Sequence, residues 1–161
     1  LELQKLLYFC HAFYLVRHDA PLVTGVFEAW RNGPVNPAVY QSFKEFGSSP
    51  IQTRASKRNY VKRTHELIDI EFPAVVKRLI EDTVYGLSKL GPWQLVNLSH
   101  AKNGPWDQVV KTSKNGIVAG MRITDDITKL HFGKLKNSVN ALGVDPKELT
   151  IFEPFEKGTY T

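Results

Sequence analysis

The stretch LELQKLLYFCHAFYL, residues 1–15, decides how the rest of the chain folds. Placed on a helix at about 100° per residue, it shows a wide apolar stripe, and further apolar side chains cover most of the remaining circumference. The stretch is too short, and too often interrupted by polar residues, to span a bilayer. We therefore expect a helix that the other elements bury nearly all round. The stripe consists of Leu3, Leu6, Leu7, Cys10, Phe13 and Tyr14, and Tyr8, Phe9, Leu15 and Val16 extend it.

One polar line runs along this predicted helix. Gln4, His11 and His18 are seven residues apart and fall within a narrow arc. A polar side chain on a buried helix is costly unless it is hydrogen-bonded. We expect Gln4 and His11 to pair inside the fold, either with the backbone of the turn at residues 30–35 or with His100.

The size and composition of the chain fit one globular domain. Its 161 residues are 42% hydrophobic and 23% charged, which is enough to form a core. We expect a mainly α (α+β) fold, a single compact helical domain with a small β element near residues 23–31. The single cysteine, Cys10, indicates a core residue in a reducing compartment. No membrane-spanning run or secretory leader is visible, so we expect a cytoplasmic protein with no membrane partner. Since the sequence starts at Leu1 and not at a methionine, we also expect residues upstream in the natural chain.

Turn and capping signals divide the rest of the chain into short elements. Val23–Trp30 is typical of a short strand, and Arg31-Asn32-Gly33-Pro34 is typical of a turn. Residues 48–70 are the least decided part, and we expect a loop or an irregular ribbon there. Trp30, Trp93 and Trp106 fall where a small domain buries aromatic anchors, with an interface role as the alternative. We expect helices over residues 37–46, 72–90 and 92–102, a short one from Pro105, one with Asp125 and Asp126 in its first turn after Thr124, and one over 135–142.

The sequence shows no pattern of catalytic or cofactor chemistry. The histidines at positions 11, 18, 65, 100 and 131 fall on separate elements, and no HExxH, CxxC, GxGxxG or GxxxxGK[ST] motif occurs. Cys10 beside His11 is a poor dyad because helical neighbours point about 100° apart and a buried thiol is inert. Asp125-Asp126 is explained by a helix start. We expect no enzyme, no catalytic residues, no cofactor and no metal.

A short basic segment is the candidate partner-binding site. The formal net charge of +5 arises entirely between Arg54 and Arg63, because removing the five cations there leaves equal numbers of basic and acidic residues. Such a segment can neutralise phosphates and stack a ring on a base, or it can bind an acidic protein. Composition alone leaves both open. The candidate residues are Arg54, Lys57, Arg58, Tyr60, Lys62 and Arg63.

Several stretches of the chain resemble a known family. LQKLLYFCHAFYL, then FEAWRNGPVNPAVYQSF over residues 27–43, and then the thinner W-x-L, LSH and PW matches over residues 93–106 are similar to the Panacea domain, also described as SocA-like or phage-associated GepA-like. Cys10 and Ala12-Phe13 depart from the family's usual Ala and Gly-Trp, and the helix that usually precedes this run is missing. The signature residues, which we expect to be structural, are Leu3, Gln4, Lys5, Leu6, Leu7, Tyr8, His11, Trp30, Gly33, Pro34, Val35, Pro37, Tyr40, Trp93, His100 and Trp106.

The resemblance implies an antitoxin of a bacterial or phage toxin-antitoxin system. Members of this family look like small proteins that neutralise a toxin encoded beside them by binding it, and some are thought to hand the partner to a protease. The resemblance implies a domain over residues 1–132, with residues 133–161 as an extension packed on or beside it. Our leading hypothesis is therefore direct binding of a cognate toxin. The alternative is a basic nucleic-acid-binding regulator that acts through residues 54–63. The oligomeric state stays open.

Overall fold

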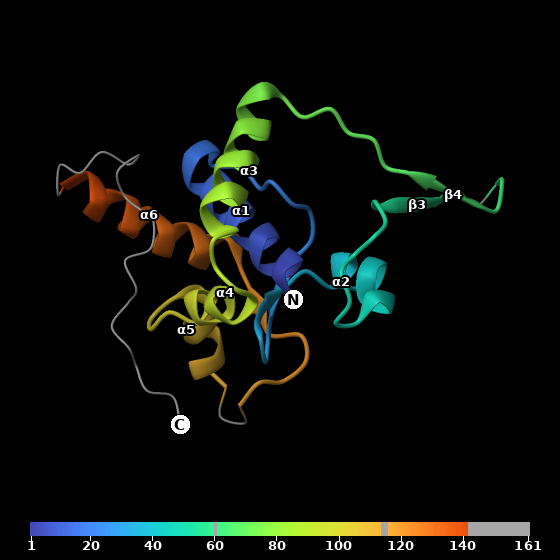
Figure 1. The fold of residues 1–161 in the computed structure, drawn as a ribbon. Coiled ribbons are helices and arrows are strands. Elements are labelled where there is room, and N and C mark those ends of the chain that lie inside the picture. The colour runs from blue at the N-terminus through green and yellow to red at the C-terminus, as the bar shows by residue number, and fades with distance from the viewer. Residues whose placement is uncertain (60, 114–115, 142–161) are drawn as a thin grey trace.

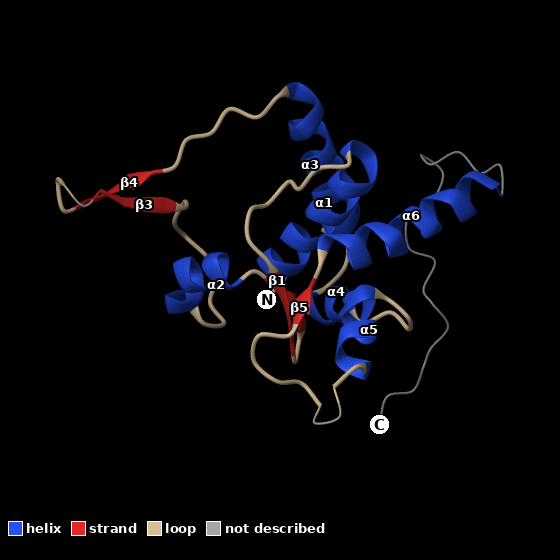
Figure 2. Cartoon of the chain, turned by 180° about the vertical axis from the view of Figure 1, so that it is seen from behind, coloured by secondary structure: helices blue, strands red, loops and turns tan. Residues whose placement is uncertain are grey.

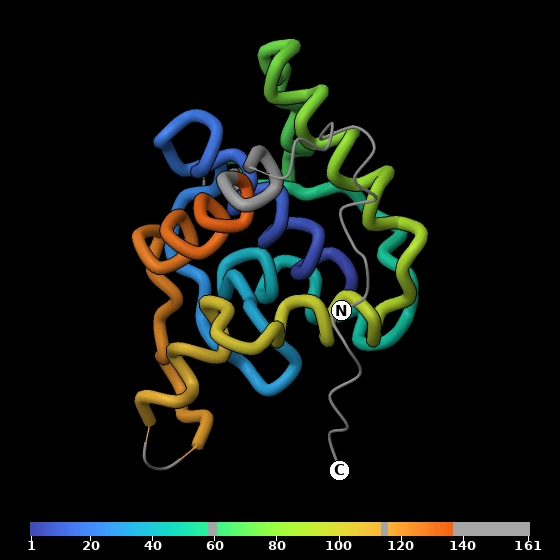
Figure 3. The backbone as a smooth tube through the Cα atoms, turned by 90° about the vertical axis from the view of Figure 1, so that its left-hand side faces the viewer, coloured from blue at the N-terminus to red at the C-terminus, as the bar shows by residue number. Residues whose placement is uncertain are grey.

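Helix α1 (Glu2–His18) is the centre of the computed structural model, which describes residues 1–59, 61–113 and 116–141. Helices α3 (Ala74–Leu87) and α6 (Asp125–Ala141) pack against α1, as do α4 (Pro92–Ser99) and strand β2 (Gly33–Val35). Figure 3 shows the dark blue α1 between the green α3 and the orange α6. The prediction of a first helix wrapped by the other elements is confirmed.

The buried side of α1 differs in detail from the predicted apolar stripe. Leu3 is 37% exposed, whereas Lys5 is 0% exposed. The apolar periodicity placed Leu3 on the buried face because it treats lysine as a solvent-facing residue, while this lysine has a partner inside the fold. The buried residues of α1 are Gln4, Lys5, Tyr8, Phe9, Cys10, His11, Ala12 and Leu15.

The small β element is a three-stranded antiparallel sheet. Strand β1 (Phe27–Trp30) forms a hairpin with β2, in which Trp30 lies opposite Gly33, and β5 (Arg122–Ile123) pairs with the other edge of β1. The predicted β element near residues 23–31 is therefore present. A two-residue strand from about ninety positions further along the chain carries no periodic signal, so β5 was not predicted.

The short helices begin where the capping signals predict. Helix α2 (Pro37–Phe43) is capped by Asn36, whose side chain accepts a hydrogen bond of 3.1 Å from the Val39 N–H, and a 3₁₀ turn (Lys44–Phe46) continues it to Gly47. Proline occupies the first turn of α4 and of α5 (Pro105–Lys111). These local signals were sufficient because each is read within a few residues.

Helix α6 is one continuous helix where the sequence predicted two. Its start is confirmed, because the Ile127 N–H donates to Thr124 Oγ1 at 3.3 Å. Gly133 lies inside the helix without breaking it. The expected boundary at residue 132 falls within α6, and residues 142–161 lie outside the described residues, so the packing of that extension stays a prediction.

The main core forms where α1 meets the sheet and the helices around it. Aromatic rings stand edge to face in it, with centroids of Tyr8 and Phe27 at 5.2 Å and of Phe9 and Phe132 at 6.2 Å. Within the described residues, no helix is both long and apolar enough to cross a membrane. The buried members of this core are Tyr8, Phe9, Phe27, Ala29, Leu87, Leu95, Val109 and Ile123.

Residues 48–70 contain a regular hairpin instead of an irregular ribbon. Strands β3 (Ser56–Asn59) and β4 (Thr64–Leu67) form their own two-stranded sheet. Figures 1 and 2 show this hairpin projecting from the body of the molecule, joined to it by two extended segments. Its sequence lacks the apolar alternation of a half-buried strand because neither face packs on the core.

Candidate functional site

The predicted basic segment lies on a projecting arm, which we define as residues 51–72. The hairpin at its end pairs Ser56 with Leu67 and Asn59 with Thr64. Arg63 closes the turn in the left-handed region, with φ of 52°. The arm leaves the body after α2 and returns to it at α3 (Figure 1). The structure therefore places Arg54, Lys57, Lys62 and Arg63 on one projecting segment, away from the core.

Part of the positive charge on the arm is already paired. Arg54 Nη2 lies 3.2 Å from Asp69 Oδ1, and Lys62 Nζ lies 3.8 Å from Glu66 Oε1. All four side chains are more than a third exposed, so each pair contributes little to the free energy of unfolding. Lys57 stands across the ladder from the same Glu66. The arm is thus less positive than the run of basic residues alone suggests.

Two candidate residues stay predictions. Tyr60 and the side chain of Arg58 lie outside the part that the structure describes. Lys57, Lys62 and Arg63 are exposed near the end of the arm.

The arm also carries exposed apolar side chains, which the search for charged motifs missed. Leu67 is 62% exposed, Ile70 59%, Phe72 47% and Ile51 41%. Isolated exposed apolar residues are ordinary, but several on one projecting segment with basic neighbours are typical of a protein interface. The sequence held a signal for this, because Leu67-Ile68-Asp69-Ile70 is apolar beside a run that was assigned to a loop.

The polar residues of α1 form a second, buried cluster. Gln4 makes two hydrogen bonds with the backbone of Asn36, accepting from its N–H at 2.8 Å and donating to its carbonyl oxygen at 3.3 Å. The prediction that Gln4 is buried and paired is confirmed, although its partner lies one residue beyond the expected turn. His18, the third member of the predicted polar line, is exposed, and its ring centroid lies 4.4 Å from that of Tyr14 with the planes tilted by 32°.

Lys5 is the most unusual member of this cluster. Its ammonium nitrogen donates to the Pro34 carbonyl oxygen at 2.7 Å, and burial lowers the pKa of its side chain to about 7. Gly33 makes room for it, since a Cβ there would lie 2.9 Å from Lys5 Nζ and 2.4 Å from Ser99 Oγ. Gly33 also has a φ of +93°, which disfavours other residues. Lys5 therefore links α1 to the β1–β2 hairpin.

His11 connects three segments that are far apart in the sequence. The Val23 N–H donates to its Nδ1 at 3.2 Å, which makes Nε2 the donor to Asp125 Oδ1 at 3.0 Å. The ring is 1% exposed. His11 is thus buried and paired as predicted, but with Val23 and Asp125 instead of His100. Asp125 therefore has two roles, because its carboxylate lies in the first turn of α6 and also accepts the hydrogen bond from His11.

His100 and Trp106 stack on each other beside the same hairpin. Their ring centroids are 3.6 Å apart at 13°, and Trp106 Nε1 donates to the Trp30 carbonyl oxygen at 2.8 Å. Burial, with a smaller contribution from the Lys5 charge, lowers the pKa of His100 to about 4. The imidazole is therefore neutral at physiological pH.

Trp93 corrects the prediction that all three tryptophans lie in the core. Its side chain is 65% exposed on the first turn of α4, whereas Trp30 and Trp106 are partly buried. The apolar periodicity of the segment placed Trp93 in the core, but Leu95 and Val96 provide the buried side of α4.

Burial also shifts the pKa of the Cys10 thiol. It raises the pKa of Cys10 to about 11, although hydrogen bonding involving Thr83 opposes the shift. The residue is 4% exposed, so the prediction of a core cysteine is confirmed.

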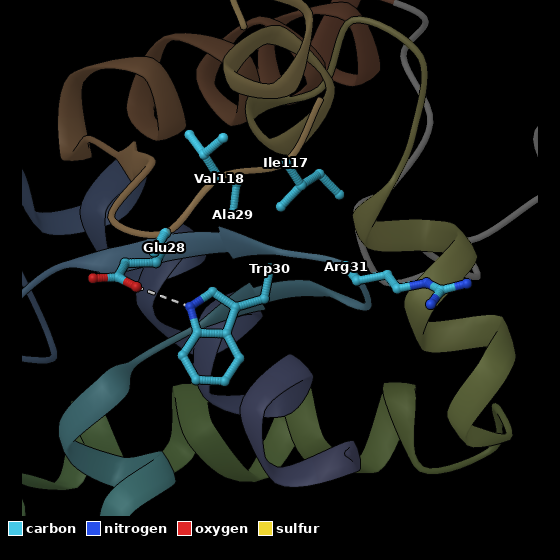
Figure 4. A pocket seen from close by; sticks show the side chains of 7 residues that line it. Glu28, Ala29, Trp30, Arg31, Ile117 and Val118 are labelled. Atoms are coloured by element: carbon cyan, nitrogen blue, oxygen red, sulfur yellow. Dashed lines mark hydrogen bonds between the residues drawn. The ribbon is translucent and has the colours of Figure 1, made fainter. Parts of the chain in front are cut away.

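An open pocket of about 290 Å³ lies between β1 and the segment that leads to β5. Figure 4 shows Ile117 and Val118 above the strand and the Trp30 indole below it, where Trp30 Nε1 donates to Glu28 Oε2 at 2.9 Å. Within the described residues, no group of three or more His, Cys, Asp or Glu side chains is placed to hold a metal ion. The pocket lining is mainly apolar and brings together no set of catalytic groups.

Comparison with known proteins identifies the family. Residues 3–107 match the family described as Antitoxin SocA-like, Panacea domain. This chain belongs to that family. The match includes every signature residue that the sequence predicted, and the structure joins most of them around the β1–β2 hairpin, with Leu3, Tyr40 and Trp93 exposed. The signature of this Panacea domain is thus largely a set of packing and hydrogen-bonding residues.

A curated relative supports the same assignment. Antitoxin SocA of Caulobacter vibrioides (strain NA1000 / CB15N) is 38% identical over 140 residues, which cover 87% of this chain and 74% of the relative. No solved structure matches the chain. The family and this relative support an antitoxin role.

Proposed function

We propose that this Panacea-domain protein is an antitoxin that neutralises a toxin by binding it directly. The observation that carries the proposal is the arm of residues 51–72, which holds basic and apolar side chains in solvent at the end of a well-packed body. A protein interface combines such apolar anchors with charged neighbours that select the partner. Family membership and the curated antitoxin relative support the same function.

The proposal describes a binding protein and not an enzyme. Lys5 and His100 have the kind of lowered pKa that is found in active sites. However, Lys5 donates to a backbone carbonyl and His100 stacks on Trp106. Both side chains are better explained as parts of the packed body of the protein.

Nucleic acid binding through the arm is the weaker candidate. A phosphate-binding surface needs cations that are available to the backbone of the nucleic acid. Arg54 and Lys62 each face a carboxylate of the same arm, which lowers the local positive potential. Reversing the charge of Lys57 and Arg63 tests this candidate, because DNA or RNA retention at low salt would fall only if it is correct.

Co-expression tests the proposed function. The protein encoded by the neighbouring gene is expressed alone and together with this chain, and growth is measured. We expect growth arrest with the neighbour alone and recovery when this chain is present. A neighbour that is harmless alone, or whose harm persists beside this chain, contradicts the proposal.

The half-life of the partner separates two ways of neutralising it. If this chain blocks the partner by occupancy, the partner accumulates in a stable complex. If it delivers the partner to a protease, the partner disappears when this chain is present and returns in a protease-deficient strain. We propose occupancy as the simpler mode, because the arm offers a binding surface and needs no second recruited protein.

A further inference from the structure

The hairpin of the arm is an incomplete sheet. Within the described residues it has two strands only, and the side chains of Lys57, His65 and Leu67 are exposed. A lone two-stranded hairpin is marginal in water, and a third strand or a packed face normally completes it. The arm therefore has a form that a partner can complete.

The register shows which backbone groups are available for a third strand. The Ile68 N–H donates to the Ala55 carbonyl oxygen at 2.9 Å, so the pair Ala55–Ile68 is hydrogen-bonded. Bonded and non-bonded pairs alternate along an antiparallel ladder. Ser56, opposite Leu67, is therefore in a non-bonded pair, and its N–H and C=O point away from β4. The same holds for Arg58, opposite His65.

Charge distinguishes the two edges of the hairpin. Strand β3 reads Ser-Lys-Arg-Asn and has two basic residues and no acid. Strand β4 contains Glu66, which lies against Lys62. A second copy of this chain would bring like charges together along β3, which disfavours edge-to-edge pairing. A strand that carries carboxylates meets opposite charge there.

We propose that the toxin adds an acidic β-strand to the β3 edge of the arm. The outward N–H and C=O groups of Ser56 and Arg58 bind the main chain of that strand, and Lys57 and Arg63 face its carboxylates. Strand addition gives affinity through the backbone and specificity through the side chains. This inference rests on the proposed function and names the recognition element within it.

Proline at Ser56 is the test, because it removes the outward N–H and leaves the β3–β4 ladder intact. The controls are Ser56→Ala, which removes only the hydroxyl, and His65→Pro, which removes an outward N–H from the opposite edge. The readout is the affinity of each purified variant for the purified product of the neighbouring gene. We expect Ser56→Pro to weaken binding at least about tenfold, and both controls to stay within about threefold. Unchanged thermal unfolding of the three variants confirms that the body is intact.

Other results overturn the inference in recognisable ways. Equal affinity of Ser56→Pro and the natural chain excludes strand addition at β3. A loss of affinity that is confined to His65→Pro places strand addition on the β4 edge and contradicts the proposed edge. If Ser56→Pro binds normally and the double reversal Lys57→Glu with Arg63→Glu removes binding, side-chain charge alone recognises the partner. The natural chain could instead retain RNA or DNA. If charge reversal removes this retention and Ser56→Pro leaves it unchanged, the arm binds nucleic acid and not a protein strand. If the isolated chain elutes as a dimer in size-exclusion chromatography and Ser56→Pro dissociates that dimer, the β3 edge binds a second copy of this chain.

The same series separates this inference from the proposed function. If the natural chain neither binds nor protects cells from the neighbouring gene product, the antitoxin proposal itself fails. If the natural chain and Ser56→Pro protect and bind equally, only the strand-addition inference fails.

Discussion

At the scale of single residues, a buried lysine is the feature that most clearly separates this chain from a generic helical domain. Lys5 is 0% exposed, and its nitrogen has a backbone carbonyl as its partner instead of a carboxylate. A charge buried in this way is costly, so the folded state favours the neutral amine. The periodicity of the sequence could not predict this burial, because the deciding contact comes from the β1–β2 hairpin.

This burial predicts a pH dependence of stability. The pKa of Lys5 is lowered from 10.5 to about 7, so between these values the unfolded state binds more protons and the free energy of unfolding rises with pH. The slope from this group is at most about 1.4 kcal/mol per pH unit. Urea unfolding between pH 7 and about 8.5, below the range in which Cys10 contributes a slope of opposite sign, should show a positive slope in the natural chain and lose it in Lys5→Met. The exposed Lys44→Met is the control, and a slope that persists in Lys5→Met contradicts the account.

Gly33 should tolerate no side chain. Gly33→Ala combines a positive φ with contacts to Ser99 and Lys5, and we expect it to lower the free energy of unfolding by about 2–4 kcal/mol. Gly120→Ala is the matched control, since Gly120 has a φ of +79° but an added Cβ would meet no other atom within 4 Å, and we expect a loss of only about 1 kcal/mol. Equal losses of unfolding free energy in the two variants, measured by urea unfolding, would show that the close approach of Lys5 to Gly33 does not add to the cost of the substitution.

At the scale of elements, the sequence predicted the features that local signals determine and missed those that long-range contacts determine. The starts of α2, α4, α5 and α6 were predictable because a cap or a proline is read within one turn. Strand β5 could not be predicted, because its pairing with the distant β1 determines it. The regular β3–β4 hairpin could not be predicted either, because it lacks a buried face and so has no apolar alternation. For the site, the basic residues were found from charge alone, but their ion pairs and the exposed apolar side chains needed the fold.

The contact between α1 and α6 provides a matched pair of mutations. Asp125 and Asp126 both lie in the first turn of α6, but only Asp125 accepts the hydrogen bond from buried His11. We expect Asp125→Ala to lower the free energy of unfolding by about 1–3 kcal/mol, because the His11 N–H then loses its partner. Asp126→Ala should cost no more than about 1 kcal/mol, which is the worth of a carboxylate at an exposed helix start. Urea unfolding checks both, and equal losses would reduce the His11 contact to a helix-end effect.

At the scale of the whole molecule, a packed body and a projecting arm divide the work. The buried core joins α1, α3, α4, α5 and α6 with the three-stranded sheet, while the β3–β4 hairpin lies outside it (Figure 1). The signature residues found in the sequence all lie outside the arm of residues 51–72. In our account the body holds the arm in place, and the arm contacts the partner.

This division predicts the course of limited trypsin digestion. The first cuts should fall after the exposed basic residues of the arm, such as Lys57 or Arg63, because cleavage concentrates in projecting, weakly packed segments. The two fragments should stay together in gel filtration, since α1 on one side of the cut packs against α3 and α6 on the other. Mass spectrometry identifies the cut sites. First cuts inside α3 at Lys77 or Arg78, or fragments that separate, would contradict the division.

The most direct test of the central claim is calorimetric titration of the nuclease-treated, purified chain with the purified product of the neighbouring gene. The account predicts saturable binding without nucleic acid, with the natural chain and Ser56→Ala binding at least about tenfold more tightly than Ser56→Pro. If the chain protects cells but shows no binding in this titration, neutralisation is indirect, and the claim that the arm recognises the toxin is wrong.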